Sequence, residues 1–169
     1  CYDIETTGTD PNRDEILQLA IVNSCGEKLY NGYFKPEKAT EWLGAQAVNG
    51  ISPEMVANSP LLSSELPIIQ EIFDNAEIII GYNNLNFDDR FLNEKGIVFT
   101  GKDETDVMLE FAQLHGHYNP KYGNYKWEKL TIAAEFYDYD WQDGNEHNAL
   151  DDATATLYVY QHLKLENKM

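Results

Sequence analysis

Cysteine is scarce in this chain of 169 residues, which contains only Cys1 and Cys25. Two cysteines in no metal-ligand spacing exclude both the disulfide framework of a small secreted protein and a cysteine-based zinc cluster. The sequence also has no run near the roughly 18 apolar residues of a membrane span, and its start is unlike a signal peptide. We therefore expect a soluble, cytoplasmic protein.

Basic residues are few: 12 Lys and Arg stand against 29 Asp and Glu, which gives a net charge of −17. Such a charge repels a polyanion and argues against tight, salt-driven binding to a nucleic-acid duplex. Any binding of nucleic acid must therefore be confined to a limited part of the protein surface.

The sequence lacks an internal repeat, a low-complexity linker and an initiator methionine. Hydrophobic residues make up 43% and aromatic residues 12% of the chain, enough for a packed core. We expect residues 1–169 to form a single domain. Because too few residues precede Glu5 for a strand of usual length, we also expect that N-terminal residues are missing.

Several segments have the composition of β-strands. Residues 16–23 and 29–34 are rich in β-branched and aromatic residues, and Ser24 to Gly26 supply turn chemistry between them. This pattern predicts a hairpin that follows a first strand ending at Asp3. Residues 77–82 form a continuous apolar run, which predicts a strand buried on both faces.

Helical signals alternate with these strands. Ser63 is predicted to cap a helix that ends near Asn75, and Pro67 is acceptable there if it lies in the first turn. Further helices are predicted at residues 86–96, 107–115 and 129–136, and after Asn148 as an N-cap. Antiparallel strands followed by alternating strands and helices predict an α/β fold with a mixed sheet and helices on its faces.

Asp3 and Glu5 are two residues apart, so an extended strand places both on one face. The spacing can present two oxygen ligands to one cation, and the following Thr6, Thr7 and Gly8 offer backbone donors with room for close approach. Taken alone, the pair is more often a solvated strand edge.

Asp88 directly follows the predicted buried strand and begins the next helix, which is where sites form on α/β sheets. The alternative is that Asp88 and Asp89 only cap that helix and complement its dipole.

His147 and Asp152 lie on either side of the predicted start of the last helix. The imidazole can stand outside the first turn while the carboxylate projects from it, and histidine suits proton transfer near neutral pH. The alternative is a surface histidine beside a helix whose early acids, Asp151 and Asp152, complement the dipole.

Three fragments together carry a resemblance: DIETTG, NxxxFD (Asn83 to Asp88) and HNALDDA. They resemble the three motifs of the DEDDh family of 3′–5′ exonucleases, which includes the proofreading epsilon subunit of bacterial DNA polymerase III, ribonuclease T and exonuclease I. AVNGISPEMV and TDVMLEFA are similar to two further family segments. The resemblance implies a ribonuclease H-like fold, with a five-stranded mixed β-sheet flanked by α-helices.

The resemblance also implies roles for five residues. Asp3, Glu5, Asp88 and Asp152 would hold two divalent cations, Mg²⁺ or Mn²⁺, and His147 would be the general base. Oxygen ligands favour these metals, and clustered carboxylates repel each other unless cations neutralise them.

The implied substrate contacts are less constrained. By resemblance, the backbone of Thr6, Thr7 and Gly8 would hold the terminal nucleotide, and the other contacts would come from Val48, Asn49, Asn83 and Phe87. For Val48 and Phe87, plain core packing is an equal alternative. Two departures from the family pattern, Asn49 and Tyr82 where members carry His, concern this pocket.

Residues 115–129, HGHYNPKYGNYKWEK, are aromatic and locally basic within an acidic chain. They could form a wall that guides a single strand; a surface loop whose aromatics pack inward is an equal alternative.

The sequence therefore predicts a 3′–5′ exonuclease that acts on single-stranded or frayed DNA in proofreading or repair and releases nucleoside 5′-monophosphates. Its partners would be the 3′ end of single-stranded DNA or RNA and a DNA polymerase subunit. Two alternatives stay open: an exonuclease that trims RNA or degrades oligoribonucleotides, and a catalytically silent module that binds nucleic acid or protein.

Overall fold

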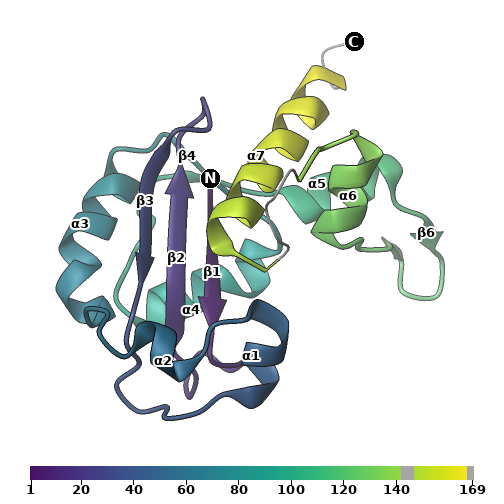
Figure 1. Ribbon diagram of the computed structural model, residues 1–169. Coiled ribbons are helices and arrows are strands. Elements are labelled where there is room, and N and C mark those ends of the chain that lie inside the picture. Colours follow the sequence, from purple (N-terminus) through teal and green to yellow (C-terminus); the bar gives the residue numbers. More distant parts are fainter. Residues whose placement is uncertain (142–146, 167–169) are drawn as a thin grey trace.

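The computed structural model describes residues 1–141 and 147–166. Its first sheet is antiparallel, in the order β1-β2-β3, and its strands are β1 (Tyr2–Thr6), β2 (Ile16–Val22) and β3 (Lys28–Tyr33) (Figure 1). The predicted hairpin is confirmed. The prediction that the first strand ends at Asp3 is wrong, because β1 stays paired with β2 as far as Thr6, which lies opposite Ile16. Both Asp3 and Glu5 therefore lie on the strand itself.

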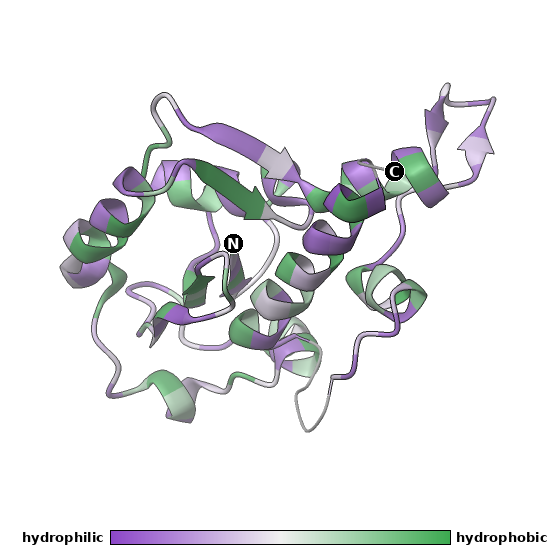
Figure 2. Cartoon of the chain, turned by 90° about the horizontal axis from the view of Figure 1, so that it is seen from above, coloured by the Kyte–Doolittle hydropathy of each residue, from purple (hydrophilic) through white to green (hydrophobic). Residues whose placement is uncertain are grey.

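A second, parallel pair consists of β4 (Ile78–Gly81) and β5 (Asp103–Asp106). β4 is the predicted apolar strand, whereas β5 has the sequence DETD, which carries no strand signal. Figure 2 shows this contrast, with a hydrophobic strand running parallel to a hydrophilic one. β4 contacts β1, so the two units lie side by side.

The mixed α/β arrangement is thus confirmed, and five strands are present in it. Within the described residues, however, the hydrogen-bonded ladders divide them into a three-stranded and a two-stranded unit. A single continuous five-stranded sheet is therefore only partly reproduced.

The helices follow the predicted order, with two additions before the third. They are α1 (Leu43–Asn49), α2 (Pro53–Val56), α3 (Leu62–Asp74), α4 (Asp88–Glu94), α5 (Val107–His115), α6 (Leu130–Phe136) and α7 (Ala149–Glu166), with a 3₁₀ turn, η1 (Asn84–Asn86), before α4. A small hairpin of β6 (Tyr118–Asn119) and β7 (Asn124–Tyr125) separates α5 from α6. None of the helices described is long and apolar enough to cross a membrane.

The start of α3 differs from the prediction. Leu61, not Ser63, is its N-cap residue, and Pro67 lies inside the helix rather than in its first turn. A proline at this position cannot donate the helical hydrogen bond to the Ser63 carbonyl. Ser63 and Pro67 are both exposed, so water can hydrate that carbonyl.

Alternation along β1 divides its side chains between two environments. Tyr2 and Ile4 enter a core that also contains Ile69 and Phe73 of α3 and Phe91 of α4. The opposite face carries Asp3 and Glu5, and α7 packs across β1 and β2. Strand geometry thus leaves the two carboxylates on the side of the sheet that meets α7.

The segment before α1 is held by a buried carboxylate. Glu15, only 7% exposed, accepts backbone hydrogen bonds from Glu37 (2.7 Å), Lys38 (3.0 Å) and Ala39 (2.8 Å). Burial alone would raise the pKa of Glu15, but these three donors outweigh burial and lower it.

Glu15→Gln is expected to lower the free energy of unfolding by about 2 kcal/mol at neutral pH, because one amide cannot accept all three bonds. A lowered carboxyl pKa stabilises the fold above the pKa of the unfolded chain. That contribution is lost as pH falls through the folded value, so the deficit should shrink below about pH 4. Urea denaturation across pH measures this, with the exposed Glu37→Gln as control; a deficit that persists at low pH would contradict it.

Candidate active site

Strand β1 contributes two carboxylates. Asp3 and Glu5 are each partly exposed and alternate with the buried Tyr2, Ile4 and Thr6. The side-chain amide of Asn49, at the end of α1, donates to the Thr6 carbonyl (3.2 Å), and its proximity to Glu5 opposes the rise in the pKa of that carboxyl. The shared face predicted from the DxE spacing is present.

Asp88 comes from α4, the helix that follows β4. It is only 3% exposed, and its Oδ1 accepts a hydrogen bond from the backbone N–H of Ile4 (3.2 Å). The next residue, Asp89, is buried as well and accepts from the Tyr2 hydroxyl and from the Asn84 amide (3.3 Å). The hydroxyl of Tyr2 and the backbone N–H of Ile4, both in β1, thus fix the start of α4. Asp88 is hydrogen-bonded to Ile4, which lies between Asp3 and Glu5 along the strand.

His147 and Asp152 come from the start of α7. His147 is exposed, has a left-handed backbone (φ 66°) and lies before the helix, and its N–H donates to Asp152 Oδ2 (3.2 Å). Asn148 Oδ1 accepts from the backbone N–H of Leu150 (3.1 Å), so the predicted N-cap is confirmed. The imidazole therefore lies outside the first turn while the carboxylate is part of it.

These elements bring the five predicted residues together. Potential ligand atoms of Glu5, His147 and Asp152 all lie within 4.8 Å of one another. Asp3 adjoins this trio, since it interacts electrostatically with Asp88, Asp152 and Glu5. The trio differs from the predicted set of four carboxylate ligands in two respects: it includes the imidazole of His147, and it does not include Asp3 or Asp88.

The carboxylates hold their protons strongly. Burial first, and then the charges of Asp88, Asp152 and Glu5, raise the pKa of Asp3 well above its usual value. Burial and the charge of Asp152 raise the pKa of Glu5 to about 8, and burial with the charge of Asp89 raises that of Asp88 to about 8. A cluster of hard oxygen donors that repel one another fits divalent cations, which would relieve this repulsion.

The turn after β1 is built by its own side chains. Thr6 Oγ1 donates to the Gly8 carbonyl (2.6 Å), and Thr7 Oγ1 accepts from the N–H of Glu15 (2.9 Å). A Cβ atom at Gly8 would collide with the carboxylate of Asp14. The space at Gly8 is thus filled by Asp14, and the contact of Thr6, Thr7 and Gly8 with a nucleotide stays a prediction.

The predicted pocket residues have different surroundings. Val48 is 58% exposed, so the alternative of core packing is wrong for this residue. Phe87 is half-buried and packs against the core, with its ring 5.1 Å from that of Phe91, so here the packing alternative applies. Asn83, half-buried, has a left-handed backbone (φ 62°) directly before η1.

Asp106 is a residue of this region that the sequence reasoning did not single out. It is 4% exposed, and its Oδ1 accepts from the N–H groups of Asn83 (2.9 Å) and Met108 (3.1 Å). Its charge contributes to the raised pKa of Asp88. The available signal was an aspartate directly before a predicted helix, which is typical of an N-cap.

Comparison with known proteins gives relatives whose sequence similarity extends over almost the whole length of this chain. It is 30% identical over 168 residues to a PolC-type DNA polymerase III of Ureaplasma parvum, covering 96% of this chain and 11% of that protein. It is 30% identical over 163 residues to RNA exonuclease 4 of Aspergillus fumigatus, covering 94% and 48%. It is 29% identical over 166 residues to the DNA polymerase III epsilon subunit of Aquifex aeolicus, covering 94% and 76%. The chain thus spans half or less of the first two relatives.

Among solved structures, E. coli exonuclease I in complex with a dA16 oligonucleotide superposes with a TM-score of 0.77 at 21% identity, covering 99% of this chain and 40% of that one. This similarity confirms the ribonuclease H-like α/β fold. A family model described as an exonuclease, RNase T, matches residues 1–160. The resemblance identified from the three sequence motifs is therefore confirmed, and the chain belongs to the RNase T exonuclease family.

Proposed function

We propose that this chain is a divalent-metal-dependent 3′–5′ exonuclease that hydrolyses the terminal phosphodiester of single-stranded or frayed DNA. It would release nucleoside 5′-monophosphates and serve DNA proofreading or repair. The observation that carries the proposal is the convergence of Glu5, His147 and Asp152 within 4.8 Å, beside the partly exposed Asp3 and the buried Asp88. Membership of an exonuclease family supports hydrolysis rather than binding alone.

The proposed ligands of two Mg²⁺ or Mn²⁺ ions are Asp3, Glu5, Asp88 and Asp152. The family depends on divalent metal, and the choice of these two ions rests on a donor set dominated by carboxylate oxygen. Bound cations would supply a lowered pKa for water and stabilisation of the charge that develops on the leaving oxygen.

His147 is the proposed general base. Its exposure places the imidazole where water reaches it, and its nearness to Glu5 and Asp152 keeps it at the carboxylate cluster. The hydrogen bond from its backbone to Asp152 (3.2 Å) ties its position to the first turn of α7. From this position the imidazole would take the proton of the attacking water.

The terminal nucleotide is proposed to lie over the turn of Thr6, Thr7 and Gly8 and against Val48 and Asn49. The exposure of Val48 supports a contact with the sugar or base, because this side chain has no packing role. Asn49 is adjacent to Val48 in sequence, donates to the Thr6 carbonyl and influences the pKa of Glu5, which supports a position close to both.

RNA is the second candidate substrate. It is favoured by one finding, the 30% identity to an RNA exonuclease over 94% of the chain. Discrimination between the two sugars depends on contacts to the 2′ position. Matched DNA and RNA oligonucleotides decide between the candidates by their kcat/KM.

A DNA polymerase subunit is the proposed protein partner. The support is that two of the relatives are a DNA polymerase III and an epsilon subunit of DNA polymerase III.

The function is tested by metal binding and by product analysis together. Mn²⁺ at about a hundred times its Kd should stabilise the fold by about 2.7 kcal/mol, which raises Tm by roughly 5–10 °C. With Mn²⁺ bound, a 5′-labelled single strand should shorten from its 3′ end and yield nucleoside 5′-monophosphates. Stabilisation by Mn²⁺ without any release of mononucleotides would show that the chain is a catalytically silent binding module. Absence of stabilisation by Mn²⁺ would contradict the proposed metal site.

A further inference from the structure

The surface around the small hairpin differs from the rest of the chain. Residues 118–127, which we term the aromatic arm, contain four exposed aromatic side chains: Tyr118 (58%), Tyr122 (67%), Tyr125 (39%) and Trp127 (51%). In the described part of the chain, only one other aromatic side chain, Phe136, is comparably exposed. The alternative of inward-packed aromatics is therefore wrong for this segment.

The arm also differs in charge. It carries Lys121 and Lys126 and no acidic residue, whereas the whole chain has a net charge of −17. Lys121 Nζ lies 5.0 Å from the ring centroid of Tyr122, so a cation and an aromatic face are presented together. Lys126 is paired with Glu128 just outside the arm (2.9 Å). This combination complements a polyanion that also has aromatic bases.

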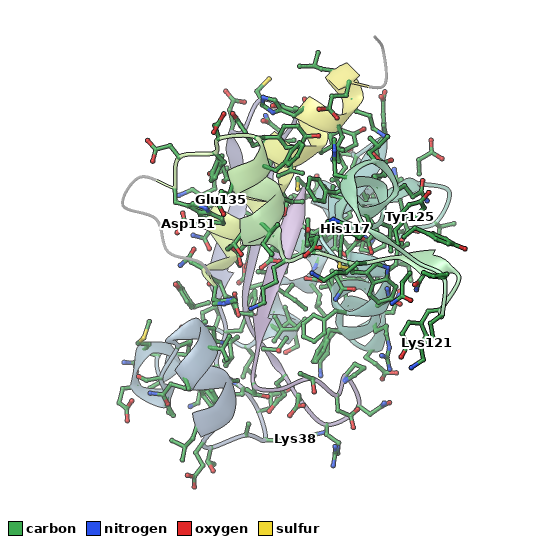
Figure 3. All side chains as sticks on the ribbon, turned by 90° about the vertical axis from the view of Figure 1, so that its right-hand side faces the viewer. Lys38, His117, Lys121, Tyr125, Glu135 and Asp151 are labelled. Atoms are coloured by element: carbon green, nitrogen blue, oxygen red, sulfur yellow. The ribbon has the colours of Figure 1, made fainter. Side chains whose placement is uncertain are left out.

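The arm is built as a hairpin. β6 and β7 pair through Tyr118 with Tyr125 and Asn119 with Asn124, and the two tyrosine rings meet edge to face with centroids 5.4 Å apart. Figure 1 shows β6 on a loop that extends beyond α5 and α6, and Figure 3 shows Lys121 at the outer edge of the molecule. The hairpin thus presents its side chains away from the core.

The base of the arm is joined to the candidate active site. The hydroxyl of Tyr82 donates to the Glu128 carbonyl (2.8 Å), directly after the arm. Tyr82 immediately precedes Asn83, from which η1 leads to Asp88. A strand leaving the carboxylate cluster along this loop would therefore meet the base of the arm.

We propose that the aromatic arm binds the single strand on the 5′ side of its terminal nucleotide. Tyr122 and Trp127 stack on bases, and Lys121 binds a phosphate. Such stacking tolerates any base but needs unpaired ones, so the arm selects single strands over duplexes. It also gives an acidic protein a local attraction for its substrate. This inference rests on the proposed function and adds a second contact region to it.

The test compares substrates of two lengths. In a Tyr122→Ala, Trp127→Ala double variant, KM for a single strand of about fifteen nucleotides should rise roughly tenfold, while kcat stays unchanged. Kinetics on a dinucleotide, too short to reach the arm, should not change. Tyr122→Phe with Trp127→Phe keeps aromatic faces and should restore most of the affinity.

A separate Lys121→Ala variant should weaken the salt dependence of KM, and the exposed Lys28→Ala serves as its charge-matched control.

A binding measurement makes the test independent of turnover. Fluorescence of Trp127 should be quenched by a single strand with non-hydrolysable linkages, and the quench should be lost in Trp127→Phe. Equal KM values for wild type and the alanine variant, together with no quench of fluorescence, would contradict the proposal that the arm binds the single strand. An equal rise in KM of the alanine variant on the dinucleotide would also contradict this proposal, because it would show that the defect lies in the candidate active site. If wild type releases no mononucleotides but the quench persists, the proposed function fails and the arm stands.

Discussion

Asp3→Asn is expected to reduce kcat by a factor on the order of 10³ or more while the fold is kept. Asp3 interacts with three other acids of the cluster, Asp88, Asp152 and Glu5, so its charge is central to the proposed metal site. Asparagine has nearly the same volume and retains one oxygen but lacks the negative charge. The loss should therefore come from the chemistry and from metal affinity, not from packing.

The same variant should be more stable than wild type when metal is absent. The pKa of Asp3 is raised, so the folded protein binds more protons than the unfolded chain between the ordinary carboxyl pKa and the raised one. Stability of the metal-free protein then falls as pH rises across this interval, in which Glu5 and Asp88, with pKa values of about 8, take part. Removing one repelling charge should recover roughly 1–2 kcal/mol near pH 8.

Three measurements check the Asp3 prediction: single-turnover rates, Mn²⁺ titration by calorimetry, and urea denaturation in EDTA from pH 5 to pH 8, a range set by the carboxyl pKa values above. The exposed Asp103→Asn on β5 is the matched control and should change none of them. Unfolding of Asp3→Asn would make Asp3 a structural residue. Full activity would remove it from the proposed mechanism.

The parts of the fold that could be predicted are the elements whose burial is reflected in an apolar sequence pattern. β2 and β4 are apolar because they are covered, and the turn between β2 and β3 needs Gly26, which has a positive φ of 79°. β5 could not be predicted, because three of its four residues are at least partly exposed and its strand geometry comes from pairing with β4. The same holds for α1, which has no buried residue to impose a helical pattern.

The candidate site was predictable for a different reason. Its chemistry requires particular residue types, and the turn, cap and strand contexts of Asp3, Asp88 and Asp152 are local in sequence. That His147 and Glu5, 142 positions apart, belong to one site was implied by the family resemblance and not by any local pattern. The support that Asp106 gives to Asn83 could not be predicted, because it depends on how β5 meets the end of β4.

His147→Ala is expected to lower kcat by about 10²–10⁴-fold, the usual contribution of a positioned general base. It should leave the free energy of unfolding nearly unchanged, because the side chain is exposed. Its backbone hydrogen bond to Asp152 does not depend on the imidazole. The exposed His117→Ala is the matched control and should retain wild-type kcat.

The pH profile distinguishes a base from a metal ligand. Histidine accepts a proton only in its neutral form, so wild-type kcat should rise with pH if His147 is the general base. Glu5 and Asp88 could give a similar rise, since their pKa values are about 8 in the metal-free protein. Saturating Mn²⁺ favours their ionised forms and moves that titration to lower pH. The comparison is therefore made at saturating Mn²⁺. If kcat rises with pH in wild type but not in His147→Ala, the imidazole is the proton acceptor. A rise that persists in the variant, together with weakened Mn²⁺ binding, would instead make His147 a ligand of the cluster that it shares with Glu5 and Asp152.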